Sequence, residues 1–492
     1  MWLTSLLSLR SRDSDRGPRA KPTLARCRQS FVPRLETLED RTLLSTLTVL
    51  NNLDHGTDSL RYAIGHARDG DSIVFAAALN GQTITLTSGE LDIKNSVDIE
   101  GPGANFLTIS GNDTSRVFDI SAGLTVTIAG LTITHGRAAG NWGGGAIQNI
   151  GSALTLVGDV FANNRADGSN SNASIVGGGA VTSRNGAVLT VSACSFNDNQ
   201  VIAGGSGGYG LGGAIWNRAS ATIIGSTFTG NRAVGGDGGR VSSNAILIGI
   251  ANGGAVFNDS EATLTVADSV FTGNEAIGGN GGSGGAGATV YFIGGATGGG
   301  IANGLDAGLL AVSGCTFTYN RAIGGSSATG GTSGQGAVGS ASGGGLANRS
   351  VATVTGSIFD HNEAFGGSGN SGGSGPITFS RGAGGGISNA FGAILTVSSC
   401  TLTANQATGG AGAIGGSGGN GLGGGVWNDS GSTLTILTST ITDNHATGGA
   451  AGTGGSAGQG IGGGAYFAPG GVVCLDLFTK KRISRNSAST SN

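Results

Sequence analysis

The stretch Gly423–Ala446, GGGVWNDSGSTLTILTSTITDNHA, contains every element of the repeat that decides the fold. It begins with a glycine run, a hydrophobic residue and Asn428, continues through the alternating run Thr433–Ile436, and ends around Ile441 and Asn444. Alternation of apolar and polar residues is a strand signal, and the glycines between such runs indicate turns. Three strand-like pieces within these 24 residues are close to one turn of a three-sided coil.

Both elements of this unit recur along most of the chain, as they do in solenoids. The first starts at Gly144-Gly145-Ala146-Ile147-Gln148-Asn149, and its hydrophobic position returns at Val181, Ile215, Val256, Ile301, Leu346, Ile387, Val426 and Tyr466. Its Asn column is Asn149, Asn217, Asn258, Asn303, Asn348, Asn389 and Asn428, with Ser183 and Ala468 as exceptions. The second element has an aromatic column at Phe161, Phe196, Phe228, Phe271, Phe317 and Phe359, which Leu402 and Ile441 continue. Its Asn column is Asn164, Asn199, Asn231, Asn274, Asn320, Asn362, Asn405 and Asn444.

One such coil cannot bury its inward side chains alone, so the coils above and below must cover them. We therefore predict an all-β fold: a single-stranded right-handed parallel β-helix, or pectin-lyase-like solenoid, with Phe and Asn ladders. The period is 34 residues from Ile147 to Val181 and 45 from Val256 to Ile301, and the variation falls in Gly-rich stretches. These predict loops of different length at one corner. A short helix at Ser59–Ala67, capped by Asp58 or Ser59, is expected to cover the open N-terminal edge.

Two further columns bear on whether the coils stack in register. The residue after each second-element Asn reads Arg165, Gln200, Arg232, Glu275, Arg321, Glu363, Gln406 and His445. Opposite charges would then face each other between neighbouring coils, although an exposed pair contributes only about 0–1 kcal/mol. Cys194, Cys315 and Cys400 lie two residues before the aromatic column, where other coils have serine. They are two or three coils apart at ~4.8 Å per coil, beyond the ~4.4–6.8 Å of a disulfide, so we expect buried thiols.

Composition limits the class of protein. Gly accounts for 101 of 492 residues without a Gly-X-Y period, and charged residues are only 11%. The net charge of -3 does not favour nucleic acid as a partner, and no apolar run is long enough for a transmembrane helix. We expect four segments: 1–45, a basic and disordered export or sorting segment; 46–140, the cap and first coils; 141–470, the repeat helix; and 471–492, a last partial coil and tail.

The paired Gly-Gly-Ala-Ile and Phe-x-x-Asn elements of residues 143–446 resemble the repeats of chlamydial-type polymorphic outer-membrane proteins. This resemblance implies a surface-displayed β-helix implicated in adhesion and followed by an autotransporter barrel. No barrel follows before Asn492, so self-export through one is not expected. The run Pro33–Ser45 is similar to the LEPR-xLL signature of large bacterial surface and secreted proteins, and Asp58–Arg61 with Gly70–Phe75 looks like the start of many bacterial β-helices. Both imply a location in the cell envelope, at the outer-membrane surface or in the medium.

Catalytic residues should interrupt the ladders on a few adjacent coils, because they must replace ladder residues. The nearest candidates for catalysis are Asp360 with His361 and Asp443 with His445, while Asp259 and Asp429 are either ligands or turn residues. All of them obey the repeat. We therefore predict no catalytic residue, no metal and no cofactor, and favour a non-catalytic structural or adhesin-like protein whose partners are extracellular glycans or the surfaces of host or neighbouring cells. The alternative is a polysaccharide lyase or glycoside hydrolase of this fold; the ligand, export route and oligomeric state stay open.

Overall fold

The computed structural model describes residues 44–140, 142–169, 175–205, 207–240, 247–284, 290–330, 335–372 and 377–491. The expectation for the basic N-terminal segment thus falls almost entirely outside the described residues. The described chain is a parallel β-helix whose six sheets contain only parallel strands. Its helices are α1 (Leu60–His66), α2 (Leu477–Lys480) and a short 3-10 turn, η1 (Ala77–Leu79). No helix among the described residues is long and apolar enough to cross a bilayer.

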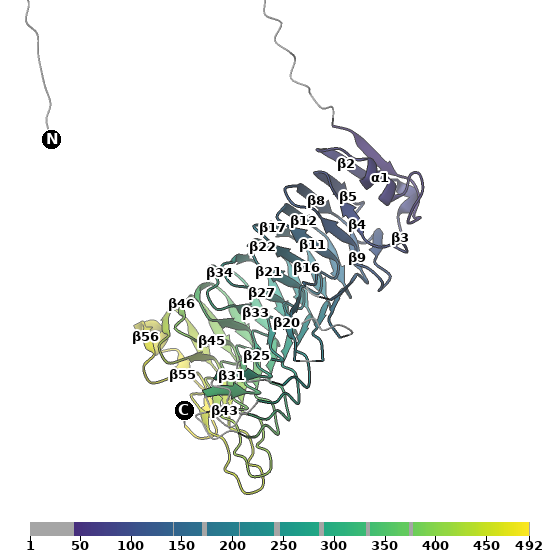
Figure 1. Ribbon diagram of the computed structural model, residues 1–492. Helices are drawn as coiled ribbons and strands as arrows, with labels where there is room; N and C mark the ends of the chain where they lie inside the picture. The colour runs from purple at the N-terminus through teal and green to yellow at the C-terminus, as the bar shows by residue number, and fades with distance from the viewer. Residues whose placement is uncertain are drawn as a thin grey trace, which may run out of the picture. The chain divides into compact units, whose positions relative to one another are not determined.

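One coil shows how the chain winds. It passes through β21 (Ile215–Asn217), β22 (Ser220–Ile224), β23 (Thr227–Thr229), β24 (Arg232–Val234), β25 (Leu247–Ile248) and β26 (Ala251–Asn252) before β27 (Val256–Asn258) starts the next coil. Each strand pairs with its counterpart one coil further on, so strands of successive coils stack into long sheets, from α1 at the purple end to β56 at the yellow end (Figure 1).

Three sheets surround the main core. Sheet A has 13 strands, from β1 (Thr46–Val49) to β56 (Val472–Leu475). Sheet B has 12, from β3 (Gln82–Thr85) to β57 (Ile483–Ser484), and sheet C has 11, from β4 (Leu91–Ile93) to β55 (Ala465–Phe467). Their inward residues form one continuous hydrophobic cluster, in which the six Phe rings are fully buried.

The predicted aromatic and Asn ladders are both present. Successive Phe rings from Phe161 to Phe359 stack with centroids 4.6–4.8 Å apart. In the second Asn column, Asn320 donates from its backbone N–H and from Nδ2 to Asn362 Oδ1, at 3.0 and 2.9 Å, and Nδ2 also donates to the Phe271 carbonyl. Each buried amide thus closes the turn after sheet B and ties three coils together. Buried polar groups are tolerated when they are bonded in this way.

The last coil shifts the first element by one residue relative to the sequence alignment. Val426 pairs with Ala465 and Asn428 with Phe467, so Tyr466 is not in the hydrophobic column and Ala468 is not in the Asn column. Three glycines precede the hydrophobic position in this coil, as in most others. The sequence alignment took the second of these glycines as the first glycine of the Gly-Gly element, and this shifted the register by one residue. Tyr466 therefore faces outward, beside Trp427.

The Gly-rich stretches leave each coil at the same place, as expected, but they are more regular than loops. They follow sheet D, which is formed by the residues after the second Asn column and has 10 strands from β10 (Arg137–Ala139) to β58 (Ser487–Ala488), and they contribute sheet E, 8 strands from β15 (Ile175–Gly177) to β54 (Gly460–Ile461). Sheet F adds β25, β31 (Val290–Ile293), β37 (Gln335–Val338) and β43 (Ile377–Phe379). Sheets D and E pack together through small side chains such as Ala276, Ala322 and Ala296, and together with sheet F form a layered arm.

Close packing of this arm explains the Gly-Gly element. Gly298 has a φ of +64°, which favours glycine. At Gly299, a Cβ would lie 2.4 Å from the backbone nitrogen of Arg321 in sheet D. The first glycine therefore makes the turn into sheet C, and the second lets the backbone of sheet D approach.

The N-terminal segment contains the expected capping helix. Ser59 caps α1 by accepting a hydrogen bond from the Tyr62 N–H, and Leu60, Ala63 and Ile64 are buried against the first coils. The first coils expected in residues 46–140 contain β1, β2 (Asp71–Phe75), β3, β5 (Val97–Glu100), β6 (Leu107–Ser110) and β8 (Thr125–Ala129). Shorter strands such as β7 (Phe118–Ile120) and β9 (Thr132–Thr134) complete these coils.

Cysteine and serine form a ladder of their own beside the Phe rings. The backbone N–H of Cys315 donates to Ser357 Oγ at 3.1 Å, and the Ser357 N–H reaches Cys400 Sγ. The three cysteines are buried and unpaired, and burial raises the pKa of the Cys194 thiol to about 12. Asp159 takes this position one coil before Cys194. Its Oδ1 accepts from the Leu131 N–H, its Oδ2 has no partner among the described residues, and burial raises its pKa to about 8.

The alternating charges form the expected ion-pair ladder. Arg232 Nε lies 3.0 Å from Glu275 Oε2, Arg321 Nη1 lies 3.2 Å from Glu275 Oε1, and Arg321 Nε lies 3.1 Å from Glu363 Oε2. The side chains are partly exposed, so each pair is worth about 0–1 kcal/mol.

Candidate functional site

The first predicted candidate pair, Asp360 and His361, lies on the surface at the turn after sheet B. Asp360 ends β41 (Ile358–Asp360), and His361 Nδ1 lies 2.8 Å from Asp360 Oδ1. The His361 ring stacks on Tyr319 of the previous coil, with centroids 5.0 Å apart. The structure thus brings these two residues together.

The second pair has other partners. Asp443 Oδ2 accepts from Arg485 Nη2 at 2.6 Å, and His445 Nδ1 lies 2.7 Å from Ser487 Oγ. Asp360 is in register with Thr403 and Thr442, so it stands in a different column from Asp443. No contact within the described ranges joins the two pairs. That none of the four residues is catalytic stays a prediction.

A different surface gathers aromatic and basic side chains. The middle residue of each sheet C strand faces away from the core and toward sheet E, because the residues on either side of it point inward. Trp216 packs there against Leu211, and Trp427 against Leu422. From β11 (Ile147–Ile150) onward this outward column reads Gln148, Thr182, Trp216, Phe257, Ala302, Ala347, Ser388, Trp427 and Tyr466. Small residues therefore leave space between Phe257 and Trp427.

Two adjoining hollows, of about 310 and 110 Å³, lie along this face and have Leu247, Asn252, Thr297, Leu305 and Arg349 in common. We call them together the aromatic groove. Its aromatic and charged lining consists of Trp142, Tyr209, Trp216, Phe257, Phe292, Phe391, Trp427, Arg218, Arg349, Arg381 and Asp259. The groove runs along several coils, so an extended ligand would meet similar positions about every 4.8 Å.

At the Trp216 end of the groove, the polar groups have partners within the chain. Trp142 stacks parallel on Trp216, with centroids 5.8 Å apart, and the Arg218 guanidinium lies 5.1 and 5.3 Å from the two ring centroids. Asp259 Oδ2 accepts from Trp216 Nε1 at 3.0 Å and lies 3.1 Å from Arg218 Nε. One carboxylate thus serves both an indole N–H and a guanidinium. Asp259, left open by the sequence as ligand or turn residue, is used inside the groove.

At the Trp427 end, the indole N–H and the guanidinium groups lack such a carboxylate partner among the described residues. The Arg381 guanidinium lies 4.3 Å from the Trp427 ring centroid, and that of Arg349 lies 5.2 Å from the Phe391 centroid. Both arginines reach solvent in part, but protein atoms surround their guanidinium groups. This burial, with the nearby charge of Arg381, lowers the pKa of Arg349 to about 10, so Arg349 stays positive at neutral pH, and burial also lowers the pKa of Arg381. Within the described residues neither makes an ion pair, and buried Arg381 Nε and Trp427 Nε1 have no acceptor.

Flat aromatic faces with guanidinium groups between them suit planar or ring-shaped ligands that carry acceptors or negative charge. The sequence reasoning missed this groove because it treated the residue between the hydrophobic position and Asn as variable. A signal was available: Trp216, Phe257 and Trp427 occupy that one position, and Arg218 and Arg349 both directly follow the Asn column.

A cluster of carboxylates lies near the N-terminal end of sheet C. Carboxylate oxygens of Glu90, Asp92 and Asp119 lie within 4.8 Å of one another. Arg116 Nη1 approaches Glu90 at 2.7 Å and Asp119 at 3.7 Å, and Lys94 pairs with Asp92. Arg116 and Lys94 thus offset two of the three negative charges of this cluster.

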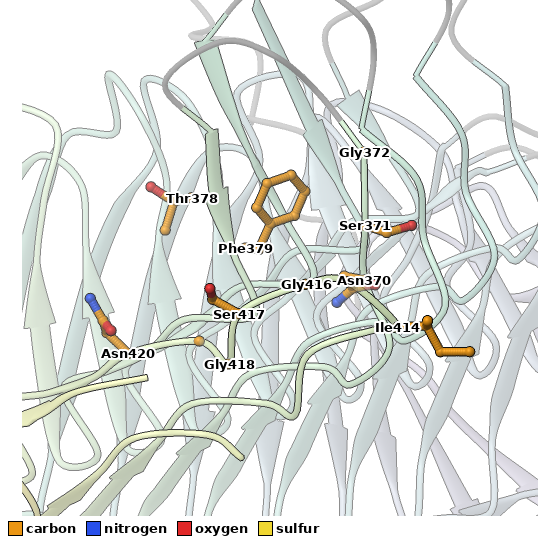
Figure 2. A pocket seen from close by; sticks show the side chains of 12 residues that line it. Asn370, Ser371, Gly372, Thr378, Phe379, Ile414, Gly416, Ser417, Gly418 and Asn420 are labelled. Carbon is orange, nitrogen blue, oxygen red and sulfur yellow. The ribbon is translucent and has the colours of Figure 1, made fainter. Parts of the chain in front are cut away.

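Figure 2 shows a further hollow in the Gly-rich arm, of about 590 Å³. Asn370, Ser371, Thr378 and Phe379 of one coil face Gly416–Gly418, Asn420 and Ile414 of the next. It is larger than the aromatic groove, but its described lining has no charged group and only one aromatic ring, so it offers less chemistry.

Comparison with known proteins yields little beyond the fold. No protein-family model matches the chain, and no curated protein matches it. An alginate lyase of the PL6 family is similar in structure at 10% identity and a TM-score of 0.21, over 90% of this chain and 100% of that chain. The A-module of an Azotobacter vinelandii mannuronan C-5 epimerase is similar at 12% identity and a TM-score of 0.16, over 86% and 97%. At these values neither likeness bears on activity, and the resemblance to polymorphic outer-membrane proteins stays an expectation.

Proposed function

We propose that this chain is a non-catalytic β-helical protein of the cell surface or the secreted fraction that binds glycans along the aromatic groove. The observation that carries the proposal is the row of Trp142, Trp216, Phe257 and Trp427, with arginines stacked on its rings, along one face of the solenoid. Ligand sites combine aromatic walls with a few placed polar groups. The length of the groove along the coils favours an extended polymer.

The enzymatic alternative needs more than the groove offers. A glycosidase of the usual kind uses two carboxylates. Asp259 is the one carboxylate among the described residues that line the groove, and it is engaged by Trp216 and Arg218. An adhesin-like or structural role, which uses binding without turnover, agrees better with this lining.

Intrinsic fluorescence provides a direct test, because three of the four tryptophans lie in the groove. Titration of the full chain with polygalacturonate, dextran sulfate and unmodified dextran is expected to change the emission with at least one polymer. Incubation with the same polymers should release no new reducing ends and no unsaturated products. Absence of any spectral change would overturn the proposal, and turnover lost on Asp360→Asn or Asp443→Asn would establish the enzymatic alternative.

A variant pair localises the binding. Trp142 is 38% exposed and forms the outer face of the groove, so Trp142→Ala should weaken binding at least tenfold. Tyr319→Ala is the matched control, since Tyr319 is an exposed aromatic residue that stacks on His361 outside the groove. Equal effects of the two substitutions would place the binding elsewhere.

Location is tested by fractionation of cells that express the tagged chain with and without residues 1–45. The proposal expects the intact chain at the envelope or in the medium and the shortened chain inside the cell. Retention of the intact chain inside the cell would contradict the proposed location.

A further inference from the structure

The two ends of the aromatic groove differ in how their polar groups are paired. At the Trp216 end, Asp259 of the next coil supplies an acceptor for Trp216 Nε1 and a counter-charge for Arg218. The equivalent residue beyond Trp427 is Ala468: the Asp259 N–H donates to the Asn217 carbonyl, and the Ala468 N–H donates to the Asn428 carbonyl in the same way. A methyl group thus replaces the carboxylate.

The groups that such a carboxylate would serve are still present. Trp427 is only 2% exposed, and its Nε1 has no acceptor in the described structure. The buried Nε of Arg381 also lacks one, and Arg349 converges on the same hollow without an ion pair. A buried donor left without an acceptor destabilises the fold, and two like charges brought together add to this cost. Stacking on Trp427 and Phe391 leaves the N–H groups in the guanidinium planes free for an anion.

Burial lowers the pKa of Arg381, and the charges of Asp429 and Tyr466 oppose this shift. Asp429 makes no ion pair with either arginine among the described residues. The hollow is therefore lined by two arginines and by Trp427, and its described lining contains no carboxylate.

We propose that the hollow formed by Arg349, Arg381, Phe391 and Trp427 is a subsite for an anionic group of the bound glycan, a carboxylate or a sulfate, which takes the place that Asp259 holds at the other end. This subsite rests on the proposed glycan-binding function and specifies its ligand as an acidic polysaccharide. The exposed rings of Trp142 and Phe391 contact the sugar rings, and the arginine pair selects the charge.

Affinity for the three polymers tests the subsite in the full chain. The wild type should bind polygalacturonate or dextran sulfate at least tenfold more tightly than unmodified dextran, with the difference shrinking between 50 and 500 mM NaCl as salt screens the charges. The better of the two anionic polymers identifies the group as carboxylate or sulfate. Arg349→Gln and Arg381→Gln should each weaken anionic binding at least tenfold and leave dextran binding unchanged.

Two further variants separate charge from folding. Ala468→Asp places a carboxylate where Asp259 stands at the other end, so it should compete with the ligand and also weaken anionic binding at least tenfold. Arg321→Gln is the matched control, because Arg321 also stacks on a ring, that of Phe365 at 5.3 Å, but lies outside the groove. Thermal unfolding of each variant checks that the coil is intact.

The outcomes distinguish the subsite from the proposed function. If Trp142→Ala weakens binding while Arg349→Gln, Arg381→Gln and Ala468→Asp have no effect, the anionic subsite is wrong and the glycan-binding groove stands. If none of the polymers binds, both are wrong. Equal loss in Arg321→Gln and Arg381→Gln would show a general charge effect and also overturn the subsite.

Discussion

The inward column of sheet B and the outward column of sheet C run along the same coils but vary very differently. The inward column repeats Phe from Phe161 to Phe359, with rings 4.6–4.8 Å apart. The outward column changes from Trp216 through Ala347 to Trp427. An inward side chain has its own equivalents above and below it, so any change opens a gap or a clash. An outward side chain meets the arm or solvent and is free to differ, so ligand specificity can arise there.

The largest expected effect comes from breaking the inward column. Phe271→Ala removes a fully buried ring between Phe228 and Phe317, and large-to-small changes of this kind cost about 3–5 kcal/mol. Urea denaturation followed by circular dichroism measures the loss. Thr272→Ala, at the neighbouring outward position, is the control and should cost under about 1 kcal/mol. Similar values for the two would refute the distinction between the columns.

Asp159 shows how a buried ionisable side chain affects stability in the inward column of cysteine and serine residues. Because Asp159→Ser introduces the serine that four other coils have here and removes an unpartnered buried carboxyl, it should stabilise the fold by about 1–3 kcal/mol at pH 8. The gain should depend on pH. The folded carboxyl keeps its proton up to a pKa of about 8, whereas the unfolded one releases it near 3.8, so wild-type stability falls as pH rises between these values.

Urea denaturation at pH 5 and pH 8 measures this dependence. The gain from Asp159→Ser should be larger at pH 8, while Asp198→Ser, at an exposed turn, should show no difference between the two pH values. A gain for Asp159→Ser that is independent of pH would mean that the carboxyl ionises normally in the fold.

The smallest expected effect concerns the ion-pair column of Arg232, Glu275 and Arg321. This column is regular, like the Phe column, but its side chains face outward. Glu275→Gln removes the charge that pairs with Arg232 and Arg321 and should cost about 0–1 kcal/mol, less at high salt. Denaturation at 50 mM and 1 M NaCl measures it, with Gln200→Glu as the converse change in the same column. A loss as large as that of Phe271→Ala would show that regular spacing, rather than burial, sets the energy.

Sequence reasoning reached the core of the fold because core residues repeat. The Phe column, the Asn column and the alternation of Arg232, Glu275 and Arg321 each predicted contacts that the structure contains. The capping helix followed from its local signals at Ser59. Where a coil departs from the pattern, as at Ala465–Phe467, alignment by residue type gave the wrong register, because an aromatic residue was taken for the missing aliphatic one.

The arm and the groove could not be predicted in the same way. Strands such as β26 and β44 (Gly382–Ala383) have two residues of small size, so they carry no hydrophobic alternation, and their pairing follows from the stacking of the coils. The groove depends in turn on the arm, because sheet E supplies its second wall. Without that wall, Trp216 and Trp427 are isolated exposed aromatics, and Arg349 and Arg381, 32 positions apart, have no reason to meet.

The Asn ladder has a genetic consequence. Asn320 makes the same bonds to Asn362 that Asn274 makes to Asn320, so a coil recognises its neighbour by residue type rather than by position. Duplication or loss of a gene segment that encodes one whole period would rejoin the ladder without a mismatch and change the length of the solenoid by ~4.8 Å. An insertion within a strand would shift the columns, whereas the Gly-rich stretches already vary in length between coils without doing so. We therefore expect natural variants in the number of core strands to differ by whole coils, and the groove to lengthen or shorten in the same steps.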